Sequence, residues 1–102
     1  MSYIVTKTHV RPSTEVEWYI GSPIITPEYV NWLNENWINN GKISLGFSFS
    51  EDQLTMTLQI TAQDEQTWND LSAQQQHIDV QALKADWNTQ HGITVTATFQ
   101  TV

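Results

Sequence analysis

Residues 43–61 read ISLGFSFSEDQLTMTLQIT, and this stretch decides the architecture. Apolar residues occupy every second position on either side of a short polar break at residues 51–53. A period of two places successive side chains on opposite faces of a strand, so each half predicts a strand with one apolar and one polar face. The break has the length of a hairpin loop, so the two strands should pair antiparallel.

Two further segments resemble strands. Residues 93–100, ITVTATFQ, repeat the same alternation. Residues 3–10 are rich in β-branched residues, but one of their faces carries Tyr3, Val5, Lys7 and His9. Because lysine avoids a dry core, we expect Lys7 and His9 on the side of the sheet that faces away from the helices. Residues 15–20 alternate well enough to predict a short edge strand after a turn at residues 11–14.

Two helical regions are marked by their ends. Thr26 can cap the first, with Pro27 at its first position and Gly41 as a left-handed stop. The second opens at residue 64, breaks over the polar residues 72–76, resumes at Asp79 and ends before Gly92. Both main helices carry apolar residues at helical spacing and lead straight into an apolar strand. The two echoing stripes are Val30, Leu33 and Trp37, then Val80, Leu83 and Trp87.

The order of elements predicts an α+β fold of the ferredoxin-like βαββαβ type. An antiparallel sheet should carry the helices on one face. The length of 102 residues favours one domain over residues 1–102. The opposite sheet face is lined by small serine and threonine side chains. Water, a ligand or a second copy of the chain could cover it, and the last alternative predicts a dimeric α/β barrel.

Composition excludes several classes of function. The formal net charge is −7, and the four basic residues are scattered, so neither a nucleic-acid partner nor an anionic membrane surface is expected. No apolar run approaches the ~20 residues of a membrane span, and the N-terminal residues lack a signal core. We therefore expect an acidic, soluble protein of the cytoplasm of its producing or host cell. There are no cysteines, and no histidine pair has metal-ligand spacing, so no metal or cofactor is expected.

Catalytic motifs are missing, and the candidates are single side chains. There is no phosphate-binding glycine loop, Gly-x-Ser-x-Gly or His-Glu-x-x-His pattern. His9 and Lys7 on the first strand, with His77 in the polar break, are the candidate catalytic residues. A satisfied histidine of the sheet is the simpler explanation of His9, and a solvated loop histidine is the simpler explanation of His77. His91 is explained as a cation at the negative end of its helix dipole.

The five tryptophans divide between core and contact. Trp37, Trp68 and Trp87 fit helix faces and are expected in the core. Trp32 lies off the stripe of its helix, and Trp18 with Tyr19 lies in the expected edge strand. These three residues are the candidates for a subunit interface, with a ligand pocket as the alternative.

Residues 54–61, LTMTLQIT, followed by residues 64–71, DEQTWNDL, carry a resemblance. A hairpin strand that runs into an acidic helix start with an aromatic residue and a leucine resembles antibiotic-biosynthesis-type monooxygenases and stress-responsive proteins of the dimeric α/β-barrel superfamily. The chain also resembles small uncharacterised proteins from marine viruses and environmental sequences, which implies a metagenomic or phage origin. Haem-degrading members carry an Asn, a Trp and a His at positions where this chain has His9, Thr61 and, loosely, His77. The threonine argues against haem chemistry.

These observations predict a homodimeric module without evident catalytic machinery. The alternatives are a cofactor-independent monooxygenase or isomerase-like enzyme, and a binder of small aromatic or apolar molecules. Either alternative would use a pocket between sheet and helices, near Trp68, Thr61 and Phe47.

Overall fold

A four-stranded antiparallel sheet forms one layer of the protein, and the computed structural model describes residues 2–102. The strand order is β2-β3-β1-β4, with the first strand in the middle beside the last. This order results when two strand–helix–strand halves interlock, as in a ferredoxin-like fold, and it confirms the prediction from the sequence. The bounds are β1 Tyr3–Val10, β2 Ile43–Phe49, β3 Thr55–Ala62 and β4 Thr94–Thr101.

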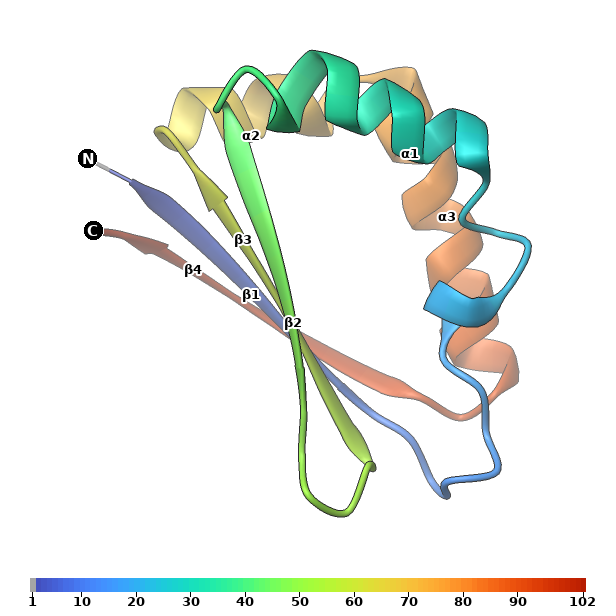
Figure 1. The fold of residues 1–102 in the computed structure, drawn as a ribbon. Coiled ribbons are helices and arrows are strands. Elements are labelled where there is room, and N and C mark those ends of the chain that lie inside the picture. The colour runs from blue at the N-terminus through green and yellow to red at the C-terminus, as the bar shows by residue number, and fades with distance from the viewer. Residues whose placement is uncertain (1) are drawn as a thin grey trace.

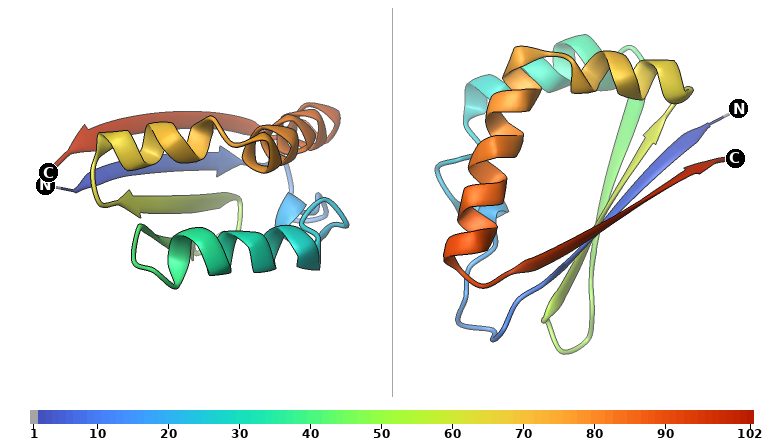
Figure 2. Two further views of the ribbon diagram at one scale, coloured as in Figure 1. Left: turned by 90° about the horizontal axis from the view of Figure 1, so that it is seen from above. Right: turned by 180° about the vertical axis from the view of Figure 1, so that it is seen from behind.

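The helices all lie on one face of the sheet (Figure 1). Seen from above, α1 runs on one side and α2 with α3 on the other (Figure 2). Their bounds are α1 Pro27–Leu33, which continues into a π-helical turn η2 Asn34–Ile38, then α2 Glu65–Ser72 and α3 Gln75–Gln90. A short 3₁₀ turn, η1, spans Tyr19–Gly21.

The expected helix ends are confirmed. Thr26 Oγ1 accepts a hydrogen bond from the Tyr29 backbone N–H at 3.2 Å, and Asp64 Oδ1 accepts one from the Thr67 N–H at 2.8 Å. Each cap satisfies a donor that the first helical turn leaves free. Gly41 and Gly92 follow the helices with φ of 77° and 69°, a conformation that favours glycine.

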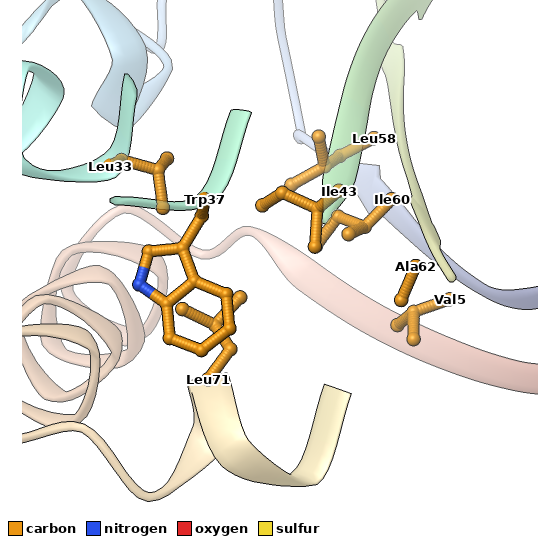
Figure 3. Close-up of a cluster of buried hydrophobic side chains, with 8 residues drawn as sticks. All are labelled: Val5, Leu33, Trp37, Ile43, Leu58, Ile60, Ala62 and Leu71. Carbon is orange, nitrogen blue, oxygen red and sulfur yellow. The ribbon is translucent and has the colours of Figure 1, made fainter. Parts of the chain in front are cut away.

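The main core lies where α1, η2 and α2 meet the sheet (Figure 3). Leu33, Trp37 and Leu71 from the helical layer pack on the sheet residues Val5, Ile43, Leu58, Ile60 and Ala62. A second buried cluster, at the other end of the sheet, joins Trp18, Tyr19, Met56 and Ile93.

The expected edge strand at residues 15–20 is wrong. These residues form turns and the η1 turn, and Trp18 and Tyr19 are both buried although they are neighbours in sequence. A strand would point them to opposite faces, whereas here both join the second cluster. Arg11 holds the loop, because its Nη1 donates to the Val16 carbonyl at 2.7 Å and its guanidinium carbon Cζ lies 4.6 Å from the centre of the Trp18 ring.

The second helical region also differs from the prediction. The break is only two residues long, and α3 begins at Gln75 rather than Asp79. The expected apolar stripe is only partly buried, since Val80 is 7% exposed but Leu83 is 48% exposed. The side chains that α3 buries besides Val80 are polar, His77 and Asn88. The two helices therefore share a sequence pattern but do not pack in the same way.

Lys7 and His9 face the helices, so their expected placement on the outer face is wrong. Val5 pairs with Ile60, Lys7 with Leu58 and His9 with Met56, and the three partners are all buried beneath the helical layer. Since side chains alternate along a strand, burying Val5 on this face brings Lys7 and His9 onto it as well. The outer face carries the small polar residues of each strand, among them Thr6, Thr8, Thr57, Thr96, Thr98, Ser44 and Ser48.

Candidate functional site

A polar seam runs between β1 and α3, inside the layer that would normally be apolar. Lys7 and His9 project from β1, and α3 presents four polar side chains at positions i, i+4, i+7 and i+11: His77, Gln81, Lys84 and Asn88. This spacing places the four residues along one stripe of the helix. Lys7 Nζ donates a hydrogen bond to Gln81 Oε1 at 3.0 Å, and this bond links β1 to α3 in the middle of the seam.

The seam separates two cavities, which share Lys7, Tyr19, Gln81 and Lys84 in their linings. The first, called here the apolar chamber, has a volume of about 250 Å³. Its walls also include His77 and apolar side chains of β2, β3 and the helical layer, namely Val30, Leu33, Leu45, Phe47, Leu58, Ile60 and Leu71. The second, the polar chamber, has a volume of about 340 Å³ and adds His9, Asn88, Ile93, Val95 and Ala97. The lining of neither chamber includes a carboxylate.

The two lysines carry the electrostatics of the site. Burial lowers the pKa of Lys7, and burial together with the nearby Lys7 charge lowers the pKa of Lys84 to about 8. The Lys84 ammonium lies 4.8 Å from the centre of the Tyr19 ring, and that of Lys7 lies 5.9 Å from the centre of the Trp68 ring. Aromatic faces attract a cation but do not neutralise it. The site is therefore electropositive within a chain of net charge −7.

The two histidines of the seam are neutral at pH 7. Burial, and then the Lys7 and Lys84 charges, lower the pKa of His77 to about 4. Burial is also the largest cause that lowers the pKa of His9. His9 Nδ1 lies 3.2 Å from the Met56 carbonyl oxygen, so Nδ1 carries the proton and donates it there. Nε2 is left with a free lone pair.

Two buried polar atoms of the seam have no hydrogen-bond partner among the described residues: His77 Nδ1 and Asn88 Oδ1. His77 is 6% exposed and Asn88 is 8% exposed. Buried polar atoms are almost always paired, by protein, water or ligand. His77 is among the residues that line the apolar chamber, and Asn88 is among those that line the polar chamber.

The structure brings together some of the residues that the sequence singled out. Lys7 and His77 line the apolar chamber with Phe47, and His9 lines the polar chamber. Trp68 is not among the residues that line either chamber, but its ring packs edge-on to that of His77, with 5.9 Å between the ring centres. Thr61 is on the outer face, paired with Ile4 and Ser44, so it does not belong to this site.

Two of the three residues expected at a subunit interface are buried, and the third is partly exposed. Trp18 and Tyr19 are buried within their own chain, which removes the exposure on which that expectation depended. Trp32 is half-buried and packs against Tyr29 and Trp37, with ring centres 5.9 Å and 6.4 Å away. Gln81 and Lys84 were missed. Together with His77 and Asn88 they form a stripe of polar residues at helical spacing, and a search for apolar stripes does not detect such a pattern.

Within residues 2–102 no group of three potential ligands could hold a metal ion, and no helix is long and apolar enough to cross a membrane.

Comparisons with known proteins place the fold. No family model matches the chain, and neither does any curated protein sequence. Among solved structures, Rv0793 from Mycobacterium tuberculosis is similar with a TM-score of 0.66 and 9% identity, over 98% of this chain and 94% of that one. A dimeric ferredoxin-like protein from an uncultured marine organism gives 0.57 and 11%, over 99% and 94%. The de novo designed protein Foldit4 gives 0.50 and 8%, over 100% and 99%. These similarities confirm the ferredoxin-like fold.

Proposed function

We propose that this protein is a homodimeric binding protein whose cleft holds a small organic anion with an apolar, preferably aromatic, body. The observation that carries the proposal is the pair Lys7 and Lys84. Both ammonium groups are drawn out of water into a cleft whose lining contains no carboxylate. Buried charges in proteins are normally paired. A carboxylate or phenolate of a ligand would supply the missing partner.

The surroundings of the lysines support an amphipathic ligand. Leu45, Phe47 and Leu58 offer an apolar wall next to the two ammonium groups. Binding sites for small molecules combine such walls with a few convergent polar groups. The volume of about 250 Å³ favours a ligand with one ring rather than several.

The test compares three molecules of one shape: 4-methylbenzoate, 4-methylbenzyl alcohol and 4-methylbenzylamine. A ligand that binds only the native state raises its melting temperature, so thermal shift ranks them and calorimetry gives the affinities. We expect the acid to bind best, Lys7→Met and Lys84→Met to weaken it about tenfold or more, and Lys42→Met, which changes an exposed lysine, to leave it unchanged. Equal binding of the acid and the alcohol would overturn the proposal, as would no shift with any of the three.

The homodimer would form through the outer face of the sheet. Within residues 2–102 no helix covers this face (Figure 2), and its small side chains allow close approach of a second sheet. The dimeric state of the marine structural neighbour supports this assignment. Thr57→Arg, in the middle of the face, should give a monomer in sedimentation equilibrium, whereas Gln66→Arg on the exposed side of α2 should not. A monomeric wild type would refute the dimer and leave water or a ligand as the cover.

The same neighbour's marine source agrees with the environmental or viral origin expected from the sequence. That origin and a cytoplasmic location complete the proposal.

A cofactor-independent oxygenase is the second candidate, favoured by the weakly basic amine of Lys84 on the wall of both chambers. A neutral Lys84 would remove a proton from an activated CH₂ group. The carbanion would react with O₂ to a hydroperoxide, which loses water to leave a ketone. Oxygen consumption with an anthrone, in the wild type but not in Lys84→Met, would establish this activity. No consumption above that of buffer would exclude it for this substrate class.

A further inference from the structure

Lys84 is positioned to form a covalent bond as well as to attract an anion. Its amine lies on the wall that both chambers share, so a ligand in either chamber can reach it. The ammonium lies over the face of Tyr19, 4.8 Å from the ring centre. Tyr19 itself is 1% exposed and fixed in the second core cluster, so the amine has a rigid neighbour.

None of the described groups that line the two chambers beside Lys84 brings a negative charge to it. Lys7 adds a positive charge from β1, and His77 and His9 carry none at pH 7. Tyr19 and Tyr29 also stay neutral, because burial raises the pKa of both phenols. With a pKa of about 8, roughly one fifth of Lys84 is unprotonated at pH 7.4, against about one in a thousand for an ordinary lysine. Burial and a neighbouring cation are the two known ways of activating a lysine nucleophile.

We propose that Lys84 captures the carbonyl group of a small apolar oxo acid as an imine, in the cleft where Lys7 holds the carboxylate. This inference rests on the proposed binding function and names the class of ligand. Lys7 is the less suitable nucleophile because its Nζ already donates to Gln81 Oε1 at 3.0 Å.

The reaction balances without an oxidant or a reductant. The Nζ lone pair attacks the carbonyl carbon, the C=O π electrons move to oxygen, and proton transfer from nitrogen to oxygen gives a carbinolamine. The C–O bond then breaks, a C=N bond forms, and the oxygen leaves as water with both hydrogens of the amine. Protonation of the imine restores a positive charge over the Tyr19 ring, where the aromatic face already attracts the ammonium of Lys84.

Reductive trapping tests the inference. The full chain is incubated at pH 7.4 with 4-carboxybenzaldehyde and cyanoborohydride, which reduces iminium ions to stable amines, and each lysine is read by peptide mass spectrometry. We expect about tenfold or more label on Lys84 relative to the exposed Lys42, because roughly one fifth of the Lys84 amine is unprotonated at this pH. Lys84→Arg should abolish this label and leave that on Lys42, and Lys42→Arg should do the opposite. Circular dichroism checks that both variants are folded.

Binding of 4-methylbenzoate, which has no carbonyl to capture, separates the two proposals. If it raises the melting temperature while Lys84 is labelled no faster than Lys42, the imine is refuted and the binding function stands. If Lys84 is labelled selectively while 4-methylbenzoate does not bind, the imine stands and the anion site is refuted. Equal labelling with no binding overturns both, and selective labelling of Lys7 overturns the assignment to Lys84.

Discussion

Replacing Lys84 by methionine should stabilise the protein at neutral pH. Lowering the pKa from 10.5 to about 8 means that folding disfavours the charged amine by about 3 kcal/mol at pH 7. Methionine keeps the length and most of the volume of the side chain while removing the charge. Part of this gain is lost with the attraction of the ammonium to the Tyr19 ring, so we expect the free energy of unfolding to rise by about 2 kcal/mol.

The pH dependence is the more specific part of this prediction. The folded state releases the Lys84 proton near pH 8 and the unfolded state near pH 10.5. Between these values the unfolded state binds more protons, so raising the pH stabilises the wild type, by about 2 kcal/mol from pH 7 to pH 9.5. The series stops there because burial raises the pKa of Tyr19 to about 12, and its earlier ionisation in the unfolded state opposes the trend above pH 10.

Urea unfolding at pH 7.0 and 9.5, followed by tryptophan fluorescence at one protein concentration, measures both effects. Lys84→Met should lose most of the rise with pH, and what remains should come from Lys7, whose pKa burial also lowers. Lys42→Met makes the same change on the surface and should behave like the wild type. Parallel pH profiles for Lys84→Met and the wild type would refute the desolvation of this amine, and with it the electrostatic basis of the proposed site.

Three further predictions test the local structure. Thr26→Ala removes the acceptor of the Tyr29 N–H and should lower the free energy of unfolding by about 1 kcal/mol in urea, while Thr26→Ser should not. Gly41→Ala forces a side chain into a φ of 77° and should lower it by about 1 kcal/mol, whereas Gly46→Ala, on the open outer face, should be close to neutral. His77→Phe keeps a ring against Trp68 but removes the group with a pKa of about 4. The wild type should therefore lose about 2 to 3 kcal/mol more than this variant from pH 6.5 to pH 4, because the unfolded histidine takes up its proton over this range before the folded one does; equal losses would contradict it.

The strands were predictable because the alternation of apolar and polar residues in the sequence matches the two faces of the sheet. Each of β2, β3 and β4 has an apolar face and a polar face, and the register of the sheet preserves both. The alternation of side chains along β1 could also have placed Lys7 and His9 on the correct face. Val5 is the most apolar residue of its face, and Lys7 and His9 are two and four positions further on. Lys7 was assigned to the wrong face because it was judged by its own charge and not by its position two residues after Val5.

The helical layer was harder because its packing departs from amphipathic rules. The apolar stripe of α3 predicted a buried Leu83, yet the helix turns His77 and Asn88 inward and leaves Leu83 half exposed. Sequence periodicity locates a helix. It does not show which side of the helix faces the sheet when, as here, a cavity lies between the two. The loop before α1 was misread for a related reason, since both Trp18 and Tyr19 fill the space beside Met56.

The polar seam is the strongest argument for placing function in the cleft rather than on the outer face. Water can satisfy the serines and threonines outside, so that face would persist without a partner. The described residues 2–102 offer the seam no such solution. The chamber linings hold no carboxylate for Lys7 and Lys84, and two buried atoms have no hydrogen-bond partner. Apolar residues at positions 7, 77, 84 and 88 would make a more stable core. A chain that retains a local defect of this kind without internal compensation is expected to use it, and the use that fits is a ligand that brings the missing negative charge.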